Sequence, residues 1–92
     1  MILSFRHKGL ERFFTSGKKA GIQAHHAVRL RLILTMLNQA RNAMDMDAPG
    51  LRLHRLTGSL KDQWSVSVDR NWRVIFRFIG NDAELVDYVD YH

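Results

Sequence analysis

The stretch WSVSVDRNWRVIFRF, residues 64–78, decides how this 92-residue chain folds. Apolar and polar residues alternate in it twice, with Asp69-Arg70-Asn71 between the two runs. Alternation with a period of two predicts two strands with one face on a core, and the polar interruption predicts the turn that folds them back. The expected core face carries the apolar positions Trp64, Val66, Val68, Trp72, Val74, Phe76 and Phe78. The opposite face carries Ser65, Ser67, Asp69, Asn71, Arg73, Ile75, Arg77 and Ile79, so arginines stand on a rigid platform.

Helices are expected before this hairpin and further strands around it. Residues 2–5 predict a short edge strand, and residues 7–16 a helix. Residues 23–44, which contain no Gly or Pro, predict a long helix that Pro49 and Gly50 close. Alternation returns at residues 51–56, and Gly80-Asn81-Asp82 predicts a hairpin turn before a last strand. We therefore expect one α+β domain over residues 1–92, with an N-terminal strand and two to three helices packed on a small, mainly antiparallel sheet.

The composition favours a polyanionic partner. The net charge is +5, ten of the fourteen basic residues are Arg, and residues 1–44 contain eight basic residues against one acid, Glu11. Arginine makes bidentate contacts to phosphate, so nucleic acid is the first candidate, and a merely solvated basic surface is the alternative. The absence of cysteine excludes disulfides, thiol catalysis and cysteine-bound zinc. No apolar run approaches the roughly 20 residues of a membrane helix, and the N-terminus lacks the charge order of a secretory signal, so a cytoplasmic protein without a membrane partner is expected.

Several polar residues have a structural interpretation beside the functional one. The adjacent pair His25-His26 suggests a metal site, but neighbouring side chains on a helix diverge, so we expect the pair on the surface and no metal bound. His54 alone would be a solvated strand residue. Asp87 and Asp90 could pair across strands with Arg73 or Arg77.

Four motifs in order carry a family resemblance. They are Ile-x-Ser-Phe-x-His-Lys-Gly-Leu (2–10), Leu-His-x-Leu-x-Gly (53–58), the hairpin quoted above, and Asp-Tyr-His (90–92). Together they resemble the HigB toxins of the RelE/ParE superfamily. The resemblance implies a RelE-like, microbial-ribonuclease-like fold and a bacterial type II toxin that cleaves mRNA on the 70S ribosome. It also implies a HigA-type helix-turn-helix antitoxin, through which the complex binds operator DNA.

The resemblance also implies the site residues. Matched by position, the catalytic group comprises His54, Arg73, Asp90, Tyr91 and His92. RNA contacts are expected from Arg52, Arg55, Lys61, Asn71 and Arg77. One departure is Thr57, where the family often has Lys; this removes a phosphate contact for which Arg55 is the candidate substitute.

These residue types suit RNA cleavage without metal or other cofactor. A base takes the 2′-proton, the 2′-oxygen attacks phosphorus, an acid protonates the leaving 5′-oxygen, and a cation stabilises the phosphorane. Histidine serves as acid or base because its usual pKa is about 6.5. We expect His92, oriented by Asp90, and His54 to share these roles, which stay unassigned between them, with Arg73 as the cation. A noncatalytic RNA- or ribosome-binding module is the alternative, and a gyrase-directed toxin a more distant one.

Overall fold

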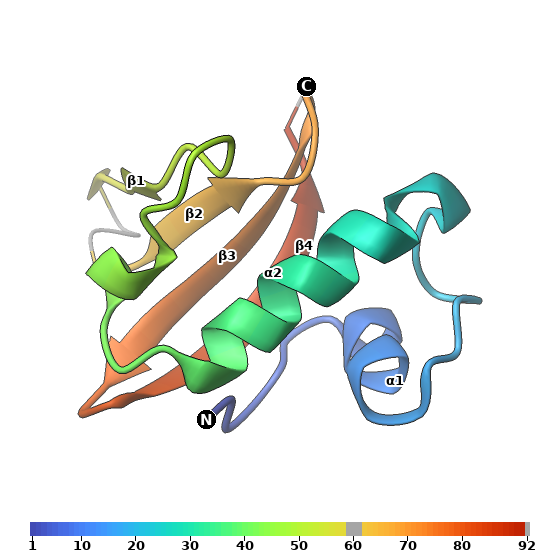
Figure 1. Ribbon diagram of the computed structural model, residues 1–92, viewed down its shortest axis with the longest axis horizontal. Helices are drawn as coiled ribbons and strands as arrows, with labels where there is room; N and C mark the ends of the chain where they lie inside the picture. The colour runs from blue at the N-terminus through green and yellow to red at the C-terminus, as the bar shows by residue number, and fades with distance from the viewer. Residues whose placement is uncertain (59–61, 92) are drawn as a thin grey trace.

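Four strands form one antiparallel sheet in the order β1-β2-β3-β4, and two helices pack on it (Figure 1). The computed structural model describes residues 1–58 and 62–91, so the predicted site residues Lys61 and His92 lie outside the described residues. The elements in chain order are α1 (Lys8–Ser16), the 3₁₀ turn η1 (Ala24–His26), α2 (Ala27–Gln39), the 3₁₀ turn η2 (Ala43–Met46), β1 (His54–Arg55), β2 (Trp64–Ser67), β3 (Trp72–Ile79) and β4 (Asp82–Asp90). The predicted α+β class is confirmed.

The hairpin predicted from residues 64–78 forms as β2 and β3, with Val66 opposite Val74. Its turn is fixed by Asp69, whose Oδ1 accepts the backbone N–H groups of Asn71 at 2.9 Å and Trp72 at 2.8 Å. An aspartate that bonds its own backbone two and three residues on is a common way to close such a turn. The second predicted turn joins β3 to β4 at Gly80, whose φ of 60° suits glycine.

The core lies between α2 and the sheet. In Figure 1, α2 runs diagonally across the sheet, and its residues Leu30, Ile33, Leu34 and Leu37 are buried. They share one cluster with Val66, Val74, Phe76 and Val86 of the strands and with Leu10 and Phe13 of α1. Burying each such side chain stabilises the fold by about 1.5–3 kcal/mol. The apolar face of the hairpin and the apolar stripe of α2 are therefore stable only when they pack against each other.

The predicted helix over residues 23–44 is too long, because α2 ends at Gln39. Ala40 turns to extended backbone with ψ 144°, and the Asp45 carboxylate accepts the Arg41 backbone N–H at 2.9 Å. Ala43 and Met46 are then buried from the separate turn η2. Apolar spacing alone did not reveal this end, because a side-chain hydrogen bond rather than Gly or Pro compensates the lost helical bond.

The N-terminal segment covers the free edge of β4. Ile2 and Phe5 form parallel bridges with Ala83 and Val86, so the expected edge strand is present as two bridges rather than a continuous strand. Leu3 donates its N–H to Ala83 O at 2.7 Å, and Arg6 donates to Val86 O at 2.8 Å. The edge backbone is therefore hydrogen-bonded, as a sheet edge requires if it is not to pair with another chain. Within residues 1–58 and 62–91 no helix is long and apolar enough to cross a membrane.

Candidate active site

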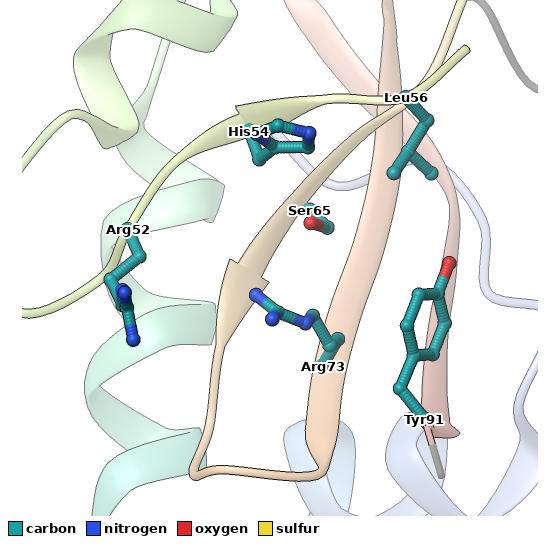
Figure 2. A pocket seen from close by; sticks show the side chains of 6 residues that line it. All are labelled: Arg52, His54, Leu56, Ser65, Arg73 and Tyr91. Atoms are coloured by element: carbon teal, nitrogen blue, oxygen red, sulfur yellow. The ribbon is translucent and has the colours of Figure 1, made fainter.

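A pocket of about 430 Å³ lies on the face of the sheet opposite α2. Its lining consists of Arg52, His54, Leu56, Ser65, Arg73 and Tyr91 (Figure 2). The volume falls in the range usual for small-ligand sites. Its lining includes two guanidinium groups, one imidazole and no carboxylate, so the pocket favours an anion.

Strand register brings these side chains together. His54 on β1 is the pairing partner of Ser65 on β2, and Arg73 on β3 is the partner of Ser67 two residues further along β2. Residues that are partners in the register share a face, and so do residues two apart on one strand, so His54, Ser65, Ser67 and Arg73 point to the same side. Tyr91 follows β4, and its backbone N–H bonds Asn71 O in the β2–β3 turn. Figure 2 shows Arg73 and Tyr91 rising from neighbouring strands, with His54 across the pocket.

Arg73 is held in place before any ligand binds. Its Nη1 donates to Ser67 Oγ at 2.9 Å, and its guanidinium carbon lies 5.9 Å from the centre of the Tyr91 ring, within cation–π range. The side chain is half-buried. A guanidinium has five N–H donors, so one bond to Ser67 leaves capacity for phosphate oxygens. Such a fixed cation stabilises developing charge without reorganising during the reaction.

Of the expected catalytic group, the structure brings His54, Arg73 and Tyr91 around this pocket. Asp90 is exposed and does not line the pocket. Its partner in the register is Trp72, which belongs to the face of the sheet that packs on the core rather than to the pocket face. His92 lies outside the described residues, so its expected pairing with Asp90 stays a prediction.

The residues expected to contact RNA are distributed differently. Arg52 lines the pocket, and Asn71 lies exposed in the hairpin turn. Arg55 has the opposite parity to His54, and its guanidinium stacks 5.7 Å over the Trp64 ring. Arg77 is bound by Glu84, with N–O distances of 2.7 and 2.6 Å.

The cross-strand carboxylate that binds Arg77 is that of Glu84 rather than the suggested Asp87 or Asp90. The reason is a register shift between Ile75 and Arg77, which brings Arg77 opposite Glu84. Leu85 takes up the irregularity with a φ of 54°, as is typical of a β-bulge. Sequence alternation assumes a regular ladder and therefore misses this pairing.

The expectation that His25 and His26 both lie on the surface is wrong for His26, which is only 3% exposed. Its Nδ1 lies 2.6 Å from the Tyr88 hydroxyl, and its Nε2 lies 2.6 Å from Asp69 Oδ2. Ligand atoms of His25, His26 and Asp69 lie within 4.8 Å of one another, so these three residues could hold a metal ion. In the described structure, however, both nitrogens of His26 are engaged in hydrogen bonds, and the ring acts as a link between the start of α2, the β2–β3 turn and β4.

Two titrating groups in this link are perturbed. The backbone N–H of Trp72, then the His26 side chain and the backbone N–H of Asn71, lower the pKa of Asp69 to about 2, because all three stabilise the carboxylate. Burial raises the pKa of the Tyr88 phenol, because the phenolate loses solvation.

Sequence reasoning missed Ser65, Ser67 and Leu56 as site residues. Ser65 and Ser67 are almost fully buried, at 2% and 6% exposure, although they lie on the polar face of the hairpin. The available signal was that both serines lie on the same face of the hairpin as Arg73. Small side chains at these positions leave room for the pocket and for the Arg73 guanidinium.

A helix layer on one face of a small antiparallel sheet and a basic pocket on the other define a compact α+β protein equipped to bind an anion. The chain belongs to the HigB-like family of RelE-like toxins from type II toxin–antitoxin systems, whose family model matches residues 3–92. The resemblance drawn from the four motifs is thus confirmed, and an antitoxin is the partner that membership implies.

Two relatives are similar to this chain over all or nearly all of their length. Endoribonuclease HigB of Proteus vulgaris is 37% identical over 92 residues, which cover 100% of both chains. Toxin HigB-1 of Vibrio cholerae serotype O1 is 30% identical over 95 residues, which cover 100% of this chain and 98% of the relative.

Proposed function

We propose that this toxin is an endoribonuclease that cuts mRNA on the ribosome. The observation that supports the proposal is that His54, Arg73 and Tyr91 line one pocket, so an imidazole and a cation held by Ser67 face the same space. The name of the relative from Proteus vulgaris, 37% identical, supports the same activity.

The proposed reaction uses the 2′-oxygen of RNA as nucleophile. A base removes the 2′-proton, the oxygen attacks the adjacent phosphorus, and an acid protonates the departing 5′-oxygen, so that one strand ends in a 2′,3′-cyclic phosphate and the other in a 5′-hydroxyl. His54 and His92, with Asp90 orienting the latter, supply the base and the acid. Arg73 neutralises the phosphorane, and Tyr91 stacks on a base or donates to phosphate. No metal or other cofactor enters this scheme.

The small number of side chains in the pocket supports the proposed dependence on the ribosome. Among the described residues, the pocket is lined by six side chains and is open to solvent, so these residues make few contacts that could align an RNA strand by themselves. Holding a reacting strand in an attack geometry supplies a large part of many rate enhancements. The decoding ribosome holds mRNA in this way.

The partner is proposed to be a HigA-type helix-turn-helix antitoxin, and the complex is proposed to bind operator DNA through that antitoxin. The toxin itself acts in the cytoplasm, where the ribosomes are.

The test is to map cut sites on ribosome-bound messages and on the same RNA without ribosomes. We expect cuts only with ribosomes, and new ends that carry 2′,3′-cyclic phosphate. Fragments with 5′-phosphate ends would contradict the 2′-oxygen mechanism, because that product requires attack by water.

Substitutions separate an enzyme from a noncatalytic binder. His54→Gln and His92→Gln should each slow cleavage about 10²–10⁴-fold, the usual contribution of an acid–base group. His25→Gln is the matched control, because His25 is exposed and does not line the pocket. If the His54 and His92 variants still arrest translation like the parent, the protein is a binder and not a nuclease.

A further inference from the structure

A second hollow of about 240 Å³ adjoins the pocket. Among its lining are Arg29, Arg52, Arg70 and Arg73, and we call it the arginine groove after these four residues. Arg52 and Arg73 also line the pocket of His54 and Tyr91, so the two hollows are neighbours that share these two arginines. The groove leads from the pocket toward the β2–β3 turn, where Arg70 lies.

The groove has a surplus of positive charge. Its lining carries four guanidinium groups and one carboxylate, that of Asp69. Both oxygens of this carboxylate are already engaged, because Oδ1 accepts the N–H groups of Asn71 and Trp72 and Oδ2 bonds His26. Asp69 therefore neutralises part of the positive charge, but its hydrogen bonds in the described structure go to His26, Asn71 and Trp72 rather than to the arginines of the groove. The groove thus remains suited to an anion.

Its arginines combine fixed and adjustable charges. Arg29 Nη2 donates to Gly50 O at 2.6 Å and to Ser67 O at 3.1 Å, which anchors one cation in the wall. Arg73 is held by Ser67 Oγ, whereas Arg70 is exposed. Arg52 has a φ of 53°, a backbone conformation that non-glycine residues rarely adopt and that concentrates at binding sites. This conformation occurs where the two hollows meet.

We propose that the arginine groove binds the phosphate of the nucleotide next to the cleaved one, so that single-stranded RNA runs from the pocket past Arg52 and Arg73 to Arg70. The inference rests on the proposed RNA-cleaving function and adds to it a second phosphate subsite. Such a subsite positions the strand without reading its bases, because phosphate contacts carry no sequence information.

Arg70→Gln tests the subsite with the least risk to folding, because Arg70 is exposed in a turn. The matched control is Arg41→Gln, an equal loss of charge at an exposed residue that lines neither hollow. The probes are a dinucleotide with one phosphate and a hexanucleotide, each with a 2′-deoxy sugar at the expected cut so that it is not cleaved. Binding is followed by NMR titration at several salt concentrations.

We expect Arg70→Gln to weaken hexanucleotide binding and to reduce the slope of log K against log salt by about 0.7, the value for one phosphate contact on a single strand. Dinucleotide binding should match that of Arg41→Gln, because one phosphate occupies only the pocket. Equal hexanucleotide affinity and slope for the two variants, or an equal loss on both probes, would overturn the subsite. If the intact protein fails to cut ribosome-bound RNA, the proposed function fails instead, and the salt slopes still report on the groove.

Discussion

Replacing Tyr88 by Phe tests whether the buried link through His26 stabilises the fold. Tyr88 is 4% exposed, and its hydroxyl lies 2.6 Å from His26 Nδ1 and 3.3 Å from the Gln23 backbone nitrogen. The ring also packs against Trp72 at 4.4 Å between centres. Phenylalanine keeps the ring contacts and removes only the hydroxyl, so His26 Nδ1 is left buried without this partner. An unsatisfied buried polar group costs about 1–3 kcal/mol, and we expect that loss in the free energy of unfolding.

Urea denaturation measures this change directly. The midpoint should fall while the slope m stays constant, because the surface exposed on unfolding is unchanged. In thermal melts each kcal/mol corresponds to about 4–8 °C for a chain of this size.

The stability difference between the parent and Tyr88→Phe should also depend on pH. Burial raises the pKa of Tyr88 in the folded state, so its contribution is present below the unfolded pKa of about 10 and is lost as pH rises above it. The gap between the parent and Tyr88→Phe should therefore narrow above about pH 10.

Tyr91→Phe is the matched control, because Tyr91 is 44% exposed and directly follows the strand that contains Tyr88. It should change stability by no more than about 0.5 kcal/mol. Equal stability of the two variants would refute the reasoning, since it would mean that the Tyr88 hydroxyl and His26 contribute nothing beyond ordinary surface groups.

Three further predictions concern the turn, a close backbone contact and the core. Asp69→Asn should reduce the loss of stability at acid pH. The Asp69 pKa of about 2 in the folded protein gives the parent stability that is fully present above about pH 4 and is lost as the pH falls toward 2. Thermal melts at a series of pH values measure this difference, and parallel plots of melting temperature against pH for the two proteins would contradict it. Gly9→Ala should destabilise by about 1–3 kcal/mol, because the added Cβ would lie 2.5 Å from Gly21 O; an unchanged melting temperature would show that the contact relaxes freely. Leu30→Ala, at a residue with no exposure, should cost about 2–5 kcal/mol in urea denaturation, and a smaller loss would mean that α2 collapses into the cavity.

The strands and their faces were predictable from the sequence. Alternation in residues 64–78 fixed β2, β3 and the turn at Asp69, because a strand's side chains alternate whatever lies on either side of it. Alternation also placed Arg52 and His54 on one face of their strand and Arg73 on the polar face of the hairpin. The structure brings these three residues together around a single pocket. Short-range spacing also gave α1, with Gly17 at its C-terminal end.

Tertiary structure alone decided what happens where distant segments meet. His26 is buried because its partners Asp69 and Tyr88, 43 and 62 positions along the chain, close over it, and no local pattern encodes those distances. Arg77 pairs with Glu84 because a bulge shifts the register of β4, and α2 stops at Gln39 because Asp45 caps the following turn. Spacing along one element therefore determined on which face of that element each side chain lies. Hydrogen bonds between elements determined which of those side chains are bonded within the protein and which remain available to a ligand.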